Sequence, residues 1–395
     1  MRFAERMERL GTENAFEVLA EVTRLRRAGR EVLSFAIGEP DFDTPEHIKE
    51  ACIQALRENL THYAPSAGLP ELREAIARHV SETRRIDVHP DEVVVTPGAK
   101  PILFFAIHAL VNPGDEVIFP NPGFPIYESV IRFVGGHPVP MPLVESRGFA
   151  FDADHLRSLV TPRTKLIILN SPHNPTGGLL SPDDLEVVAD LARTYNLWVL
   201  SDEIYSRLVY DGTFASVASL PGMKERTVVL DGFSKTYAMT GWRLGYGVMP
   251  AALAEHIARL VTNSESCVNT FVQYGGLAAL TGPQDAVDRM VAEFRARRRL
   301  MVEGLNAIPG VTCLWPGGAF YVYPNVTEAC RRLGFDDGRA LQQYLLHEHG
   351  IAVLPRTAFG SPLPEESDVY VRLSYATSRD NIERGLERMH RALAR

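Results

Sequence analysis

Between residues 93 and 249 the chain alternates short apolar runs with longer amphipathic stretches. Several of the runs are β-branched as well as apolar, which is typical of strands buried on both faces of a sheet. The stretches between them, such as 182–195, repeat their apolar positions with the helical period. The pattern predicts an α/β fold whose large domain holds a mostly parallel, seven-stranded sheet covered by helices. The expected strands are 93–96, 116–119, 139–143, 166–170, 197–201, 227–230 and 244–248.

After about residue 285 this rhythm changes. A long helical pattern over 284–306 is followed by short strand-like and helix-like segments in mixed order. We therefore expect a smaller α+β domain over 285–395 and a large domain over 45–284. The expected strands of the small domain are 311–314, 319–322, 351–353 and 369–373. Its later helices are expected at 338–349 and from 378 onward.

Composition narrows the class of protein. A chain of 395 residues suggests about two domains. An apolar content of 45% with 23% charged residues is typical of a soluble globular protein, and the net charge of −8 argues against a nucleic-acid partner. No apolar run is long enough to span a membrane. The four cysteines lack metal-ligand spacing, so we expect free thiols, no metal site and a cytoplasmic protein.

One lysine follows a strand that the pattern predicts to be buried. Lys235 lies just after the apolar run at 227–230, and Arg243 follows eight residues later. In open α/β sheets, ligands bind beyond the carboxyl ends of such strands. A lysine there can form a Schiff base with an aldehyde cofactor, and an arginine can hold that cofactor's phosphate with its planar fork. The pair is what a pyridoxal-phosphate enzyme needs.

Three further segments place polar groups at or just past strand ends. They are the runs SPHNPTG at 171–177, SDEIY at 201–205 and YVRLSY at 370–375. With the lysine run GFSKTYAMTGWR at 232–243, their order and spacing resemble the fold-type-I pyridoxal-phosphate-dependent aminotransferases, specifically the aspartate/aromatic branch. The resemblance extends from the GEPDF run at 38–42 to the last helix. It implies a homodimer with shared active sites, and an N-terminal segment, 1–44, that packs with the small domain.

The resemblance implies an enzyme that moves an amino group from an L-amino acid to a 2-oxo acid by a ping-pong cycle. Lys235 would hold pyridoxal 5′-phosphate and act as general base and acid. The turn at 96–101 joins a strand to a helix whose free N–H groups can bind an anion. By resemblance, the backbone amides of Ala99 and Lys100 would hold the phosphate with Ser234 and Arg243, and the Lys100 side chain would matter less.

The cofactor ring requires an acidic partner at its nitrogen. Asp202, at the end of a buried strand, can keep that nitrogen protonated, whereas Glu203 would point the other way. Asn174 and Tyr205 match the family's donors to the phenolic oxygen. Phe124 matches the aromatic residue that stacks on the ring, although a phenylalanine in a core is usually only core.

The substrate and the neighbouring subunit account for the remaining matches. Arg372 matches the arginine that grips the substrate's α-carboxylate, with Asn174 beside it, and Gly38 matches a backbone contact. Tyr63 matches a tyrosine that reaches the phosphate of the neighbouring subunit, so that a complete site requires a dimer. Arg356 departs from the family, which commonly has glycine there. It is read either as a tolerated surface arginine or as a second cation near the substrate side chain.

Two alternative functions share parts of this pattern. A carbon–sulfur β-lyase on the same fold would use Lys235, Asp202 and Arg372 and differ only in the fate of the carbanion. A transcription regulator with this domain would carry an additional DNA-binding module, and the acidic chain offers no basic patch for it. The motifs do not reveal which amino acid is the donor.

Overall fold

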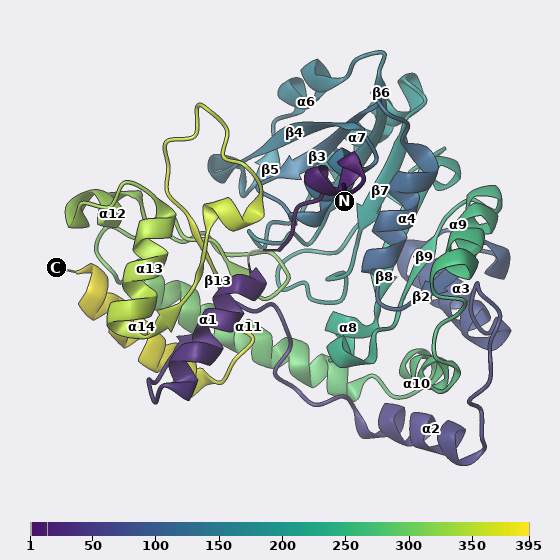
Figure 1. Cartoon of the computed structure of the whole chain (residues 1–395), viewed down its shortest axis with the longest axis horizontal. Coiled ribbons are helices and arrows are strands. Elements are labelled where there is room, and N and C mark those ends of the chain that lie inside the picture. Colours follow the sequence, from purple (N-terminus) through teal and green to yellow (C-terminus); the bar gives the residue numbers. More distant parts are fainter. Residues whose placement is uncertain (1, 14, 395) are drawn as a thin grey trace.

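The computed structural model describes residues 2–13 and 15–394 and divides into a large and a small lobe (Figure 1). The large lobe is built on a sheet with the strand order β2-β9-β8-β7-β6-β3-β4-β5. All seven expected strands are present, and a short edge strand adds an eighth. The bounds are β2 Val93–Thr96, β3 Glu116–Asn121, β4 His137–Val144, β5 Ala150–Phe151, β6 Thr164–Asn170, β7 Trp198–Asp202, β8 Thr227–Gly232 and β9 Gly245–Val248.

The middle of this sheet is parallel and its edges are antiparallel. Strands β4, β3, β6, β7 and β8 run parallel, so their carboxyl ends meet at one side of the sheet. In this register Asn170, which directly precedes the run at 171–177, lies beside Asp202 of the run at 201–205, so the two runs come together. Strands β9 and β5 are antiparallel to their neighbours.

Helices cover both faces of the large sheet because successive apolar side chains of its strands point to opposite faces. In β6, Leu166 and Ile168 pack toward α4, α5 and α9, whereas Ile167 and Leu169 pack toward α6 and α7. A third cluster packs α3 and α10 against β2 and β9. The helices are α2 Glu46–Arg57, α3 Pro70–Arg84, α4 Lys100–Leu110, α5 Ile126–Phe133, α6 Ala153–Leu159, α7 Pro182–Thr194, α8 Phe233–Thr236, α9 Ala251–Ser264 and α10 Thr270–Thr281.

The small lobe begins with the long helix that the sequence predicted. It runs as α11 Asp285–Asn306 from beside α8 into the small lobe (Figure 1). The sheet β10-β13-β12 and the pair β1-β11 complete this lobe. The expected strand at 311–314 is reduced to an isolated bridge of Thr312 with Asn325. The remaining elements are β1 Leu33–Ser34, β10 Tyr321–Val322, α12 Thr327–Leu333, α13 Gly338–His349, β11 Ile351–Ala352, β12 Leu354–Pro355, β13 Val371–Ser374 and α14 Arg379–Leu393.

The N-terminal segment contacts both lobes. Helix α1, Ala15–Arg27, buries Val22 and Leu25 in a cluster that includes small-lobe residues such as Leu346. Before α1, the Arg9 guanidinium donates to the Arg132 carbonyl at 3.0 Å, and the Gly11 N–H donates to Ser129 Oγ at 2.9 Å, both on α5 of the large lobe. The chain thus passes from the large lobe to the small lobe close to where the two meet.

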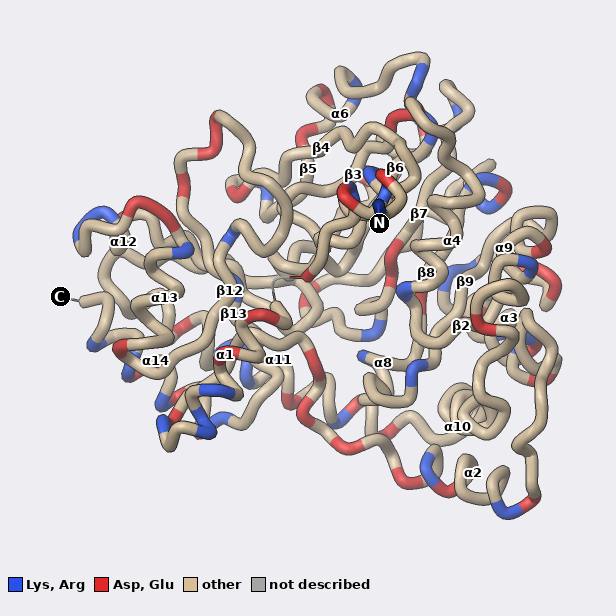
Figure 2. The backbone as a smooth tube through the Cα atoms, viewed as in Figure 1, with Lys and Arg blue, Asp and Glu red and all other residues tan. Residues whose placement is uncertain are grey.

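Charged residues surround both lobes without forming one large patch of a single sign (Figure 2). Basic positions gather near α1 and α14, where Arg384 and Arg388 both bind Glu31. Among the described residues, no helix combines the length and apolarity that crossing a membrane requires.

Candidate active site

A cavity of about 600 Å³ lies at the carboxyl ends of the parallel strands, where the lobes and the N-terminal segment meet. This is the position at which open α/β sheets bind ligands. Eleven of the twelve site residues that the sequence singled out line it: Gly38, Ala99, Lys100, Phe124, Asn174, Asp202, Tyr205, Ser234, Lys235, Arg243 and Arg372.

Lys235 reaches the cavity from the one-turn helix α8, directly after β8. Its ammonium donates to the carbonyl of Gly38 at 2.6 Å. Burial is the largest cause that lowers the pKa of Lys235 to about 8; the nearby Arg372 and Arg243 also lower it, and Glu39 and Glu13 oppose them. An amine with such a pKa is unprotonated in a substantial fraction near neutral pH, so that it can act as a nucleophile or base.

Asp202 ends strand β7 and is buried below the cavity. Its Oδ2 accepts a hydrogen bond from the hydroxyl of Tyr127 at 2.7 Å, and its Oδ1 accepts one from the backbone N–H of Ile204 at 3.3 Å. Burial raises the pKa of Asp202 to about 6 even though both hydrogen bonds favour the carboxylate. No cationic side chain within 2–13 and 15–394 is bound to this carboxyl group, which suits a residue that is completed by a cationic ligand.

Two tyrosines of the cavity were not found by sequence reasoning. Tyr127 holds Asp202, and Tyr321 shares a hydrogen bond of 2.8 Å with the hydroxyl of Tyr205. Tyr321 also lies under the Arg372 guanidinium, 4.4 Å from ring centroid to Cζ. Neither tyrosine stands in a motif that signals chemistry, and a tyrosine in an apolar run is normally core. Only the fold shows that both line the cavity.

Arg372 extends from β13 of the small lobe into the cavity. Its Nη1 donates to Asn174 Oδ1 at 2.8 Å, and its Nη2 donates to the carbonyl of Ala36. Its Nε is buried and has no hydrogen-bond partner among the described residues. Burial lowers the pKa of Arg372 from its ordinary value. A buried guanidinium with a donor to spare and no bound carboxylate is suited to a carboxylate ligand.

The far end of the cavity has the features of an anion cradle. Helix α4 begins at Lys100 with its first N–H groups facing the turn. Gly98 has a φ of +86°, a conformation that favours glycine, and the lack of a Cβ lets the turn approach the guanidinium of Arg243 closely. Arg243 is otherwise held by a hydrogen bond of 2.8 Å to the carbonyl of Thr240, and Ser234 is buried beside Lys235.

Lys100 contributes its side chain to another contact. Its ammonium is bound to the carboxylate of Glu13 and lies 5.3 Å from the ring centroid of Phe124. Phe124 in turn packs edge-on against Tyr127. Glu13 therefore places an acidic residue of the N-terminal segment at the wall of the cavity.

Tyr63 is the twelfth site residue, and it does not line the cavity of its own chain. Its side chain lies on the surface, 89% exposed, beside Thr270 and Phe271 of α10.

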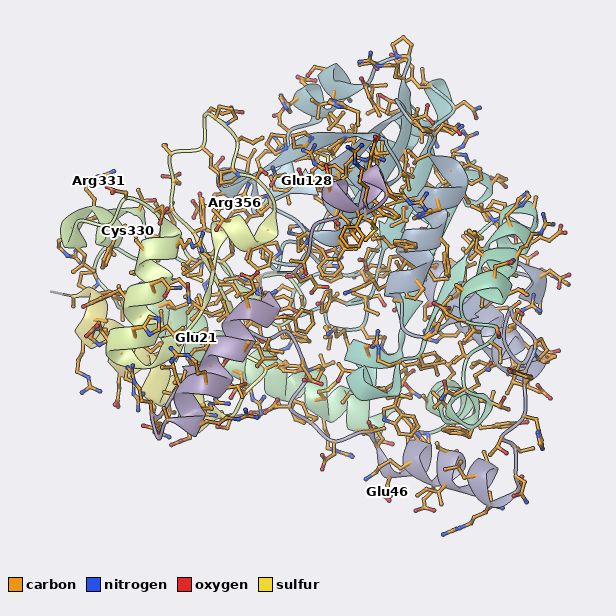
Figure 3. All side chains as sticks on the ribbon, in the orientation of Figure 1. Glu21, Glu46, Glu128, Cys330, Arg331 and Arg356 are labelled. Carbon is orange, nitrogen blue, oxygen red and sulfur yellow. The ribbon has the colours of Figure 1, made fainter. Side chains whose placement is uncertain are left out.

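The interpretation of Arg356 as a surface arginine was wrong, because the residue is only 5% exposed. It is not among the residues that line the cavity, and its role as a second cation near the substrate stays a prediction. Its guanidinium forms a fork with Glu366 at 2.6 and 2.9 Å, and it also donates to Asn121 Oδ1 at 2.8 Å. Figure 3 shows Arg356 between the helices of the small lobe and the large lobe. The sequence concealed this role because its partners lie 10 and 235 residues away.

Comparison with known proteins decides the family. Residues 30–389 match the family model of aminotransferase class I and II. The chain belongs to the class I and II aminotransferases.

Known aminotransferases match this chain along nearly its whole length. The probable aspartate/prephenate aminotransferase of Aquifex aeolicus is 42% identical over 99% of this chain and 98% of its own. The aspartate aminotransferase of Geobacillus stearothermophilus is 38% identical over 99% and 98%. The solved aspartate aminotransferase from Thermus thermophilus with maleate superposes with a TM-score of 0.93 at 38% identity, and each chain is covered completely. The expected fold and the expected transfer of amino groups are thereby confirmed, and nothing favours the lyase.

Family membership implies that the enzyme depends on pyridoxal phosphate. The residues present fit that group. A buried carboxyl group without a bound cation, an anion cradle that a Cβ would fill and a buried guanidinium with a free donor all border one cavity with Lys235.

Proposed function

We propose that this aminotransferase binds pyridoxal 5′-phosphate in the cavity, with Lys235 as the attachment point. The observation that carries the proposal is the lysine with a pKa of about 8, which shares one cavity with Asp202 and Arg372. Ser234, Arg243 and the amides of Ala99 and Lys100 would hold the phosphate. Asp202 would accept a hydrogen bond from the ring nitrogen. Asn174 and Tyr205 would face the phenolic oxygen, and Phe124 the ring.

The residues then divide the work of amino transfer. When bound, the cofactor supplies an electron sink for the bond that is broken at the substrate's α-carbon. Arg372 binds the α-carboxylate with its fork, and Asn174 and the Ala36 carbonyl fix the orientation of that fork. The carbonyl of Gly38 holds the Lys235 amine at the cavity wall, from where it can take the α-proton and return it to the cofactor side.

The substrates that we propose are an L-amino acid and a 2-oxo acid, in a ping-pong cycle in the cytoplasm. The names of the relatives support L-aspartate as the first donor to test. We also propose a homodimer in which Tyr63, exposed in one chain, reaches the phosphate of its neighbour.

Transfer of nitrogen is the direct test of this function. The purified enzyme is given ¹⁵N-aspartate and 2-oxoglutarate, and the products are followed by mass spectrometry. We expect ¹⁵N-glutamate and oxaloacetate in equal amounts, and neither with the Lys235→Ala variant. The proposal would be contradicted if none of twenty ¹⁵N-labelled amino acids gave labelled glutamate and the enzyme instead released ¹⁵N-ammonium with pyruvate.

A further inference from the structure

On the face of the strand ends opposite the cavity, a buried arginine binds two carboxylates. Arg84 is the last residue of α3, and its side chain is 1% exposed. Its Nε donates to Glu203 Oε2 at 2.9 Å, and its Nη2 donates to Asp231 Oδ2. The guanidinium also lies 5.3 Å from the ring centroid of Phe214. We call Arg84, Glu203 and Asp231 the Arg84 cluster.

The two carboxylates occupy the strands that carry the active-site residues. Glu203 directly follows Asp202 at the end of β7, and Asp231 lies in β8, four positions before Lys235. The two strands are joined by hydrogen bonds at this point, since the Glu203 N–H donates to the Leu230 carbonyl at 2.8 Å. Because neighbouring residues of a strand face opposite sides, Asp202 turns to Tyr127 and the cavity while Glu203 turns to Arg84.

The cluster is hydrogen-bonded well beyond its ion pairs. Ser201 and Ser216 donate to Glu203 Oε1 at 2.9 and 2.5 Å. Ser206 donates to Asp231 Oδ2 at 3.1 Å, and the Gly232 N–H donates to Oδ1 at 2.7 Å. A buried ion pair that is so completely satisfied has one arrangement and resists displacement.

The cluster also acts on Asp202 through its charge. The cluster places two acidic side chains and one arginine behind Asp202. Glu203 and Asp231 both raise the pKa of Asp202, in addition to the larger effect of burial. Despite burial, the same carboxylates keep the pKa of Arg84 above its ordinary value, so the arginine stays charged.

We propose that Arg84 is a positioning residue of the amino-transfer site, which fastens the ends of β7 and β8 from behind and thereby fixes where Asp202 and Lys235 stand. The inference rests on the proposed function, because it assigns these two residues to the cofactor. Arg84 is not among the residues that line the cavity. It acts only through Glu203 and Asp231, and a displacement of about 1 Å at the strand ends suffices to misplace reacting groups.

Arg84→Met tests the proposal, with Arg298→Met as the matched control. Arg298 of α11 is also a buried arginine, with its side chain 8% exposed, and it binds Asp211 of the segment after β7 at 2.5 Å, outside the cavity. For each folded variant we would measure the dissociation constant for pyridoxal phosphate by fluorescence, and kcat and KM separately. We expect Arg84→Met to weaken cofactor binding and lower kcat, each by roughly ten- to a hundredfold, with KM little changed. Arg298→Met should retain wild-type values.

A second variant covers the case in which Arg84→Met leaves its two carboxylates unpaired and does not fold. The triple variant Arg84→Met, Glu203→Gln, Asp231→Asn removes the buried charges together and keeps the side-chain shapes. We expect it to fold and to show the same loss of cofactor affinity and kcat. Wild-type affinity and kcat, within twofold, in the folded Arg84 variants would overturn the proposal, as would equal losses in Arg298→Met. A wild-type protein that does not bind pyridoxal phosphate would instead refute the proposed function.

Discussion

Buried charged residues lie on both faces of the β7 and β8 strand ends, but their partners differ. On the cavity face, Lys235 binds a backbone carbonyl, and Arg372, which extends there from β13, binds an amide and a carbonyl. The hydrogen bonds to the Asp202 carboxylate come from the Tyr127 hydroxyl and the Ile204 N–H. On the α3 face, Arg84 is bound by the carboxylates of Glu203 and Asp231. Both sets of charges are largely buried, yet in the described part of the chain only those of the α3 face are paired with one another.

This difference distinguishes charges that are paired within the protein from charges that would pair with a bound ligand. A buried charge without an opposite charge costs free energy, so a folded chain tolerates it only where function requires it. On the α3 face, the opposite charges come from the protein itself. On the cavity face, the opposite charges would come from bound molecules that carry a phosphate, a ring nitrogen and a carboxylate. The cofactor and an amino acid carry these groups.

The largest effect should come from removing the guanidinium that awaits the substrate. Arg372→Ala leaves the substrate's α-carboxylate without its partner, which typically costs about 2–5 kcal/mol, or roughly 30- to 5,000-fold in kcat/KM. Arg372→Lys keeps the charge but loses the fork, and should recover only part of the loss. Steady-state kinetics with aspartate measures both. If Arg372→Ala stays within threefold of wild type, the substrate is bound elsewhere.

The unpaired Asp202 should be visible in the stability of the cofactor-free protein. Its pKa of about 6 lies above the ordinary 3.8, so the folded state binds this proton more tightly than the unfolded state does. The free energy of unfolding should therefore fall as pH rises from about 4 to about 6, by roughly 3 kcal/mol from this group. Urea unfolding across that range, in wild type and Asp202→Asn, isolates the contribution. Parallel pH dependences in the two proteins would show that Asp202 titrates normally.

Arg356 is a buried charge that is paired with Glu366 near the cavity. Because Arg356→Gly breaks its fork with Glu366, we expect a loss of stability of about 1–3 kcal/mol. The ratio of kcat/KM for aspartate to that for phenylalanine should stay unchanged, since the side chain does not line the cavity. Glu366→Gln is the matched variant and should behave alike. A selective loss of aspartate activity in Arg356→Gly would return this residue to the substrate site.

Tyr63 should give the smallest change. If its hydroxyl reaches a neighbour's phosphate, Tyr63→Phe removes one hydrogen bond, which is worth about 0.5–1.5 kcal/mol, or roughly two- to twelvefold in cofactor affinity. Sedimentation alongside the binding assay supplies the control, because the effect requires a dimer. Full activity in a protein that sediments as a monomer would exclude a shared site.

Local patterns were sufficient for the scaffold of this enzyme. The buried strands and helices such as α13, whose bounds match the prediction at both ends, follow from apolar periodicity, which depends on near neighbours. Asp202 and Lys235 were singled out because they lie at or just past the ends of buried strands, and parallel strands bring their ends together. The resemblance to the family supplied most of the other site residues. What the sequence concealed depends on distant partners. Tyr321 meets Tyr205 across 116 positions, and Arg84 meets Asp231 across 147.

The central claim is that Lys235 is the lysine that holds the cofactor, and the cavity contains a competitor. Lys100 also lines it, but its ammonium is bound by Glu13, whereas burial lowers the pKa of Lys235 to about 8. Borohydride reduction of the cofactor-loaded protein, followed by peptide mapping, distinguishes the two. We predict a single label on the peptide that contains Lys235, and none in the Lys235→Ala variant. A label on Lys100 in the wild-type protein, or no label at all, would contradict this account.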